Sequence, residues 1–146
     1  MITIRRMRPN DSARVINMMR EFYTSSAVMT NGSEEIFAAN VENCLGGSSL
    51  VEGFVFIDGG KIIGYGITAH GYSTEFGGEC IWLEDIYIEP EYRGRGIGSK
   101  FIQHIKELYP DKILRLETEH DNAAVKLYER HGFKKLPYLE LVCTGD

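Results

Sequence analysis

Hydrophobic and polar residues follow one another in patterns that predict alternating strands and helices in the first half of the chain. Residues 2–8 alternate as a strand, and residues 9–22 begin with helix-starting polar residues and then repeat apolar side chains at helical spacing. Residues 33–45 predict a second helix. Residues 54–72 predict a hairpin, because two apolar runs flank a short glycine turn.

The second half of the chain predicts a similar succession. Residues 81–88 are rich in β-branched and aromatic side chains and run into Glu89-Pro90, which is typical of a strand that ends. Residues 97–108 carry apolar positions at helical spacing until Tyr109-Pro110. Shorter elements are predicted at residues 113–117 (a strand), 122–131 (a helix) and 133–144 (β segments around Pro137). Since no repeat, low-complexity tail or long linker interrupts residues 1–146, a single domain is expected.

The junction between the strand at 81–88 and the helix at 97–108 predicts a phosphate site. The first N–H groups of a helix have no intrahelical partner and carry the positive end of the helix dipole, so they favour an anion. Glycines at 96 and 98 lack the side chain that would hold a phosphate away, and two arginines add positive charge. The candidate anion-binding residues are Arg93, Gly94, Arg95, Gly96, Ile97, Gly98 and Ser99.

Two familiar phosphate motifs do not fit this loop. A P-loop has Gly-Lys-Ser/Thr at the start of its helix, whereas this chain has Gly98-Ser99-Lys100, with lysine and hydroxyl reversed. A dinucleotide fingerprint requires a third glycine where Ser99 stands, although Glu117 lies near the place of a ribose-binding acid. From the loop alone, a glycine-rich helix start that binds no ligand stays an open alternative.

A second segment, residues 121–133, narrows the interpretation. Together with the spacing of arginine and glycine in residues 93–98, it resembles the GCN5-related N-acetyltransferase (GNAT) family, with motifs most similar to those of diamine- and spermidine-type small-molecule N-acetyltransferases. The resemblance extends from Met1 to about Leu141 and implies an α/β acyl-CoA N-acyltransferase fold, a single mixed, mostly antiparallel sheet of six or seven strands flanked by about four helices. Within the segment it rests on Asn122, Ala123, Leu127, Tyr128, Gly132 and Phe133.

The resemblance also implies how acetyl-CoA binds as a cosubstrate. The family holds the pyrophosphate at the loop that corresponds to residues 93–99 and pairs the pantetheine arm with the edge of the preceding strand. Asp121 replaces the asparagine that the family has seven residues before its tyrosine, and the neighbouring Asn122 is the alternative contact to the arm. No metal is expected. The strand-edge residues are Ile86, Tyr87 and Ile88.

Acetyl transfer to an amine needs a base and benefits from an acid. An alkylammonium has a pKa near ~10.4 and must lose a proton before it attacks. The glutamate of a similar Leu-Glu-Asp strand takes this proton through water in diamine- and spermidine-type members, which makes Glu84 the candidate base and Glu119 the fallback. Asp85 points to the other face of the strand and is expected to pair with a neighbour. Tyr128 matches the family's tyrosine, which donates a proton to the departing CoA thiolate.

Composition limits the partners and the compartment. Sixteen Lys and Arg against 21 Asp and Glu give a net charge of −5, which disfavours nucleic acid and membrane partners and favours a cationic substrate. No run approaches the ~20 apolar residues of a membrane span, and the first residues lack the apolar block of a signal peptide, so a cytoplasmic protein is expected. Three widely spaced cysteines fit reduced thiols. A homodimer is left open.

These features together predict an acetyl-CoA-dependent N-acetyltransferase that acts on a primary amine by direct attack on the thioester. A small cationic, polyamine-like acceptor is expected to enter past an acidic rim of Glu34, Glu35, Glu75 and Glu119. Two alternatives stay open. The chain could be a protein N-terminal or lysine acetyltransferase, or a noncatalytic CoA-binding or nucleotide-sensing module.

Overall fold

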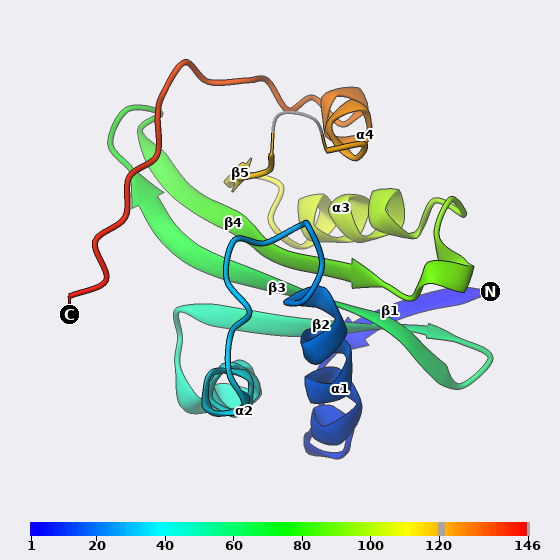
Figure 1. Cartoon of the computed structure of the whole chain (residues 1–146). Helices are drawn as coiled ribbons and strands as arrows, with labels where there is room; N and C mark the ends of the chain where they lie inside the picture. The colour runs from blue at the N-terminus through cyan, green and yellow to red at the C-terminus, as the bar shows by residue number, and fades with distance from the viewer. Residues whose placement is uncertain (120–121, 146) are drawn as a thin grey trace.

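Five strands form one sheet in the computed structural model, which describes residues 1–119 and 122–145 (Figure 1). The strands lie side by side in chain order. The first four pair antiparallel, and the fifth runs parallel to the fourth. They are β1 (Ile2–Arg6), β2 (Val51–Asp58), β3 (Lys61–Ser73), β4 (Gly78–Ile88) and β5 (Ile113–Leu116). The helices are α1 (Ser12–Phe22), α2 (Glu34–Glu42), α3 (Ile97–Leu108) and α4 (Val125–Arg130).

Helices cover both faces of this sheet and bury a separate apolar core on each (Figure 1). The apolar stripes of α1 and α2 pack on one face, where Phe22 and Tyr65 are buried. The stripe of α3 packs on the other face, where Phe54 and Phe101 are fully buried, and α4 lies beside α3. Burial of these stripes explains why helices of 9 to 12 residues are stable here.

A bulge interrupts β4 at Glu84. Leu83 pairs with Thr68 of β3 and Asp85 pairs with Ile67, so Glu84 between them has no partner on β3. Leu83 packs in the α3 core, whereas Asp85 contacts tyrosines on the α1 and α2 side. Leu83 and Asp85 therefore face opposite sides of the sheet, as two consecutive strand residues would. Glu84, between them, is exposed.

The sheet has fewer strands than the six or seven expected. Residues 133–144 hold none within the part of the chain that the structure describes, and Leu139 is 85% exposed. A strand requires a neighbouring backbone to supply hydrogen bonds, and Pro137 has no backbone N–H to donate to such a neighbour. The segment is instead held by a side chain, since the hydroxyl of Tyr138 donates to Glu75 at 2.5 Å.

The other predicted elements are confirmed with shifted ends. The first strand, the hairpin and the helix at 97–108 lie where the pattern places them. The second helix stops at Glu42 and continues as a wider turn, Asn43–Gly47. The last helix begins at Val125 rather than at residue 122, because the side chain of Asn122 accepts a hydrogen bond from the Ala124 N–H and forms a turn first.

Candidate active site

β4 and β5 separate after a short parallel pairing, and we call the point of separation the fork. Leu83 and Leu116 form the last pair between the two strands. β4 continues to Ile88, so the edge of residues 84–88 that faces away from β3 has no strand partner within the described residues. An unpaired edge can bind an extended amide chain as another strand would. Apart from the Ile88 carbonyl, which accepts a hydrogen bond from Arg93, the structure thus leaves this edge open to a pantetheine arm.

The loop after β4 presents the N-terminus of α3. Gly94 and Gly96 have φ angles of 77° and 78°, in the left-handed region, and a Cβ at either position would meet no atom within 4 Å. Gly96 is the N-cap of α3, so the N–H groups of residues 97–99 have no acceptor inside the helix. Backbone donors arranged in this way fit a pyrophosphate.

Two arginines lie beside this loop against aromatic rings. The guanidinium of Arg93 lies 5.6 Å from the ring centroid of Tyr87, and its Nε donates to the Ile88 carbonyl at 2.8 Å. The guanidinium of Arg95 lies 5.0 Å from the ring centroid of Tyr92. These contacts keep positive charge near the loop, and they also use one carbonyl of the strand edge expected to meet pantetheine.

Gly98 also contributes to packing, in addition to the phosphate contact expected of it. A Cβ at this position would lie 3.2 Å from Cδ2 of Leu127 on α4. The missing side chain therefore lets α4 pack closely against α3. A valine at position 98 would press on the Leu127 side chain as well as on a bound phosphate, so it would not test phosphate binding alone.

Replacement of Gly96 by alanine is expected to weaken CoA binding by about tenfold, since an L-residue resists the left-handed backbone and relaxation would re-aim the N–H groups of α3. Gly59→Ala is the matched control, because Gly59 has a φ of 55° in the β2–β3 turn and equally open surroundings. Calorimetry with CoA on both folded variants measures the difference. Equal affinity in the two variants would contradict a phosphate site at this loop.

Three carboxylates gather at the fork. Glu84 follows the last paired residue of β4, and Glu117 follows the last paired residue of β5. Glu140 comes from the C-terminal segment and hydrogen-bonds with Glu117; burial and this neighbour raise the pKa of Glu117 to about 7. Although Glu84 is exposed, partial desolvation by the surrounding protein and the charge of Glu140 also raise the pKa of its carboxyl. The fork therefore concentrates negative charge and retains protons more readily than isolated carboxylates.

Asp85 lies on the opposite face from Leu83, toward α1 and α2. It is 5% exposed and accepts hydrogen bonds from the hydroxyls of Tyr65 at 2.9 Å and Tyr23 at 3.2 Å. Burial raises the pKa of Asp85 to about 6, although the two hydroxyls act in the opposite direction. These contacts agree with the expectation that Asp85 pairs with neighbours.

Tyr128 packs on the α3 side of the sheet, against the same apolar cluster as Ile86 and Ile88. Its ring lies edge-on to Phe133, with 6.1 Å between centroids. Burial raises the pKa of Tyr128. The phenol therefore keeps its proton at neutral pH, which is the state that a proton donor needs.

Among the described residues, the remaining candidates make contacts away from the fork. The Asn122 side chain accepts a hydrogen bond from the Ala124 N–H at 2.8 Å, which leaves its amide nitrogen as a donor. Asp121 lies outside the described residues. In the expected acidic rim, Glu34 is paired with Arg20, whose Nε donates to it at 2.8 Å, and Glu75 accepts the hydroxyl of Tyr138. Sequence reasoning missed the partnership of Glu117 and Glu140, which no local pattern indicates.

Residues 1–119 and 122–145 contain no group of three or more histidine, cysteine, aspartate or glutamate side chains placed to hold a metal ion. They also contain no helix of the length and apolarity that crossing a membrane requires.

The forked sheet and the glycine loop that leads into α3 define the class of acyl-CoA-dependent acyltransferases. The protein-family model described as "Acetyltransferase (GNAT) family" matches residues 15–133, and the chain belongs to this family. It is therefore an N-acetyltransferase, as the motifs predicted.

Similar proteins and a similar solved structure support this assignment. Thialysine N-epsilon-acetyltransferase of Sus scrofa is 34% identical over 95% of this chain and 88% of that protein. Spermine/spermidine N(1)-acetyltransferase of Bacillus subtilis (strain 168) is 39% identical over 37% of this chain and 39% of that protein. An acetyltransferase of Clostridium acetobutylicum solved with acetyl-CoA has the same fold, with a TM-score of 0.79, 17% identity and coverage of 97% of this chain and 96% of that one.

Proposed function

We propose that this enzyme transfers the acetyl group of acetyl-CoA to a primary amine of a small cationic, polyamine-like molecule. The observation that carries the proposal is the cluster of Glu84, Glu117 and Glu140 at the fork. Carboxylates at one opening attract a molecule that carries several ammonium groups. Two relatives are named for the acetylation of thialysine and of spermine and spermidine, all of which carry a primary amine.

In this proposal, acetyl-CoA supplies the thioester and the chain's backbone positions it. The N–H groups of residues 97–99 hold the pyrophosphate at the start of α3. The free edge of residues 86–88 pairs with the pantetheine arm. Since this edge begins at the bulge, the thioester is delivered next to Glu84.

Side chains then move two protons. Glu84 accepts a proton from the acceptor ammonium, directly or through a water molecule, and its raised pKa makes it the stronger base once it is ionised. The neutral amine attacks the thioester carbon directly, so no acyl-enzyme forms. Tyr128 donates its proton to the CoA thiolate as the tetrahedral intermediate collapses.

The release of CoA thiol from acetyl-CoA, measured with a panel of amines and peptides, tests the proposal. Polyamines and diamines are expected to stimulate release strongly, and peptides with free N-termini or lysines much less. Stronger stimulation by peptides would indicate a protein acetyltransferase. Binding of CoA without any amine-dependent release would indicate a noncatalytic module.

The KM for a dicationic amine is expected to rise with ionic strength, because attraction at an exposed site is screened over a Debye length of ~8 Å. It should fall as the pH rises through about 7, because Glu117 then loses its proton and adds a negative charge. Steady-state kinetics on Glu117→Gln should show a higher KM and no such pH step. Glu107→Gln, which changes an exposed glutamate near the C-terminal end of α3, is the control. Faster turnover of neutral or anionic amines would contradict the cationic acceptor.

A further inference from the structure

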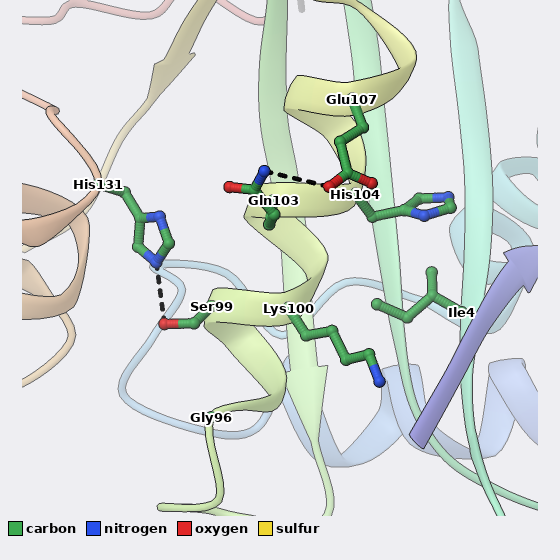
Figure 2. A pocket seen from close by; sticks show the side chains of 8 residues that line it. All are labelled: Ile4, Gly96, Ser99, Lys100, Gln103, His104, Glu107 and His131. Atoms are coloured by element: carbon green, nitrogen blue, oxygen red, sulfur yellow. Dashed lines mark hydrogen bonds between the residues drawn. The ribbon is translucent and has the colours of Figure 1, made fainter. Parts of the chain in front are cut away.

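A hydrogen bond joins the beginning of α3 to the end of α4. The Nε2 atom of His131 lies 2.9 Å from Oγ of Ser99 (Figure 2). Ser99 is the third residue of α3, directly beyond the glycine loop, and His131 is the C-cap of α4. Both side chains are half-buried. The imidazole therefore touches one of the candidate phosphate-binding residues although it is far from it in the sequence.

Two further contacts hold α4, and with it His131, against α3. Lys106 of α3 donates from Nζ to the His131 carbonyl oxygen at 2.6 Å. Leu127 packs over Gly98, where a Cβ would lie only 3.2 Å from it. A helix of six residues such as α4 has little stability of its own, so these contacts to α3 hold the imidazole beside the loop.

We propose that His131 is a positioning residue for the cofactor site, orienting the Ser99 hydroxyl toward the phosphate of CoA; this rests on the proposed function. A serine hydroxyl has one proton to donate and two lone pairs that accept. When His131 donates from Nε2 to the Ser99 oxygen, the Ser99 proton is free to point at a phosphate oxygen beside the N–H groups of α3. Without this contact, the hydroxyl can rotate away.

Charges around His131 influence its pKa and therefore the pH range over which it supports phosphate binding. Burial and the positive charges of Lys106 and Arg130 lower its pKa from the usual value. Lys100, His104 and Glu107 line the same cavity of about 490 Å³ (Figure 2). Neutral imidazole donates from Nε2 in only one of its tautomers, whereas the protonated ring always donates and adds positive charge. Phosphate affinity therefore rises as the pH falls through the pKa of His131.

Calorimetry with dephospho-CoA as the probe tests this, because its pyrophosphate lacks the phosphate monoester, which itself titrates near pH ~6. Wild-type protein is expected to bind the probe more tightly at about pH 5.5 than at about pH 8. His131→Ala should weaken binding about three- to tenfold, and Ser99→Ala/His131→Ala should lose no more than Ser99→Ala alone. His131→Gln keeps a donor and should restore affinity at the higher pH without the pH dependence.

His104→Gln is the matched control, since His104 lines the same cavity but stacks edge-on against Phe54. It should leave both the affinity and its pH dependence unchanged. In kinetics, His131→Ala should raise the KM for acetyl-CoA and leave kcat nearly unaltered. Additive losses in the double variant, or a pH dependence that persists in folded His131→Gln, would refute this proposal alone. Failure of the wild-type protein to bind CoA would refute the cofactor site of the proposed function, and this proposal with it.

Discussion

Replacement of Glu84 by glutamine is expected to lower kcat by roughly 10²–10⁴-fold, the usual contribution of a positioned base. Glutamine has nearly the same shape but cannot accept the proton of the acceptor ammonium. Because Glu84 is exposed and unpaired on β3, the fold should be preserved and CoA should bind as before. Raising the pH should partly restore the rate, since more of the substrate amine is then already neutral.

Glu117→Gln separates this effect from a general loss of charge at the fork. It removes a neighbouring carboxylate and is expected to act on KM, whereas Glu84→Gln acts on kcat. Steady-state kinetics of both variants across a pH series measure the split. Wild-type kcat in a folded Glu84→Gln protein would show that Glu84 is not the base and that Glu119 or solvent takes the proton.

Replacement of Tyr128 by phenylalanine is expected to lower kcat by a similar factor, roughly 10²–10⁴-fold, because the thiolate then leaves without a proton donor. The ring contact to Phe133 is retained, so the change removes the hydroxyl and little else. Alkaline pH should not rescue this variant, since a higher pH supplies neutral amine but no acid. The opposite responses of the two variants to pH identify which proton each residue moves.

Tyr92→Phe is the matched control for the loss of a hydroxyl. Tyr92 packs against the same apolar cluster as Tyr128 but lies in the turn before the glycine loop. Its replacement should leave kcat unchanged. An unchanged kcat in folded Tyr128→Phe as well would mean that Tyr128 only packs against the core.

The parts of the fold that local pattern determines were predictable from the sequence. The β2–β3 hairpin follows from two apolar runs around a glycine turn, and the start of α3 follows from glycine spacing and helical periodicity. These signals lie within a few residues of one another. The glycine loop was therefore located before any packing was known, whereas the strand edge of residues 86–88 was expected from the family resemblance.

Features that depend on distant neighbours were not predictable in the same way. Residues 133–144 have a composition typical of strands, but they would form a strand only if a second backbone segment paired with them. The role of Gly98 depends on Leu127, and the raised pKa of Glu117 depends on Glu140. The bulge at Glu84 appears only once β3 is laid against β4.

The bulge in β4 places the proposed base, Glu84, at a position that the packing of the sheet does not require. Leu83, Asp85 and the residues beyond them fill both cores in regular alternation, and Glu84 is an addition that neither core requires. A chain that lost this single residue would keep its sheet register and its apolar layers but would lack the proposed base. Among proteins of this fold, a shortened fourth strand would therefore mark an acetyl-CoA binder that has lost or relocated its proton acceptor, while overall structural similarity would not reveal the change.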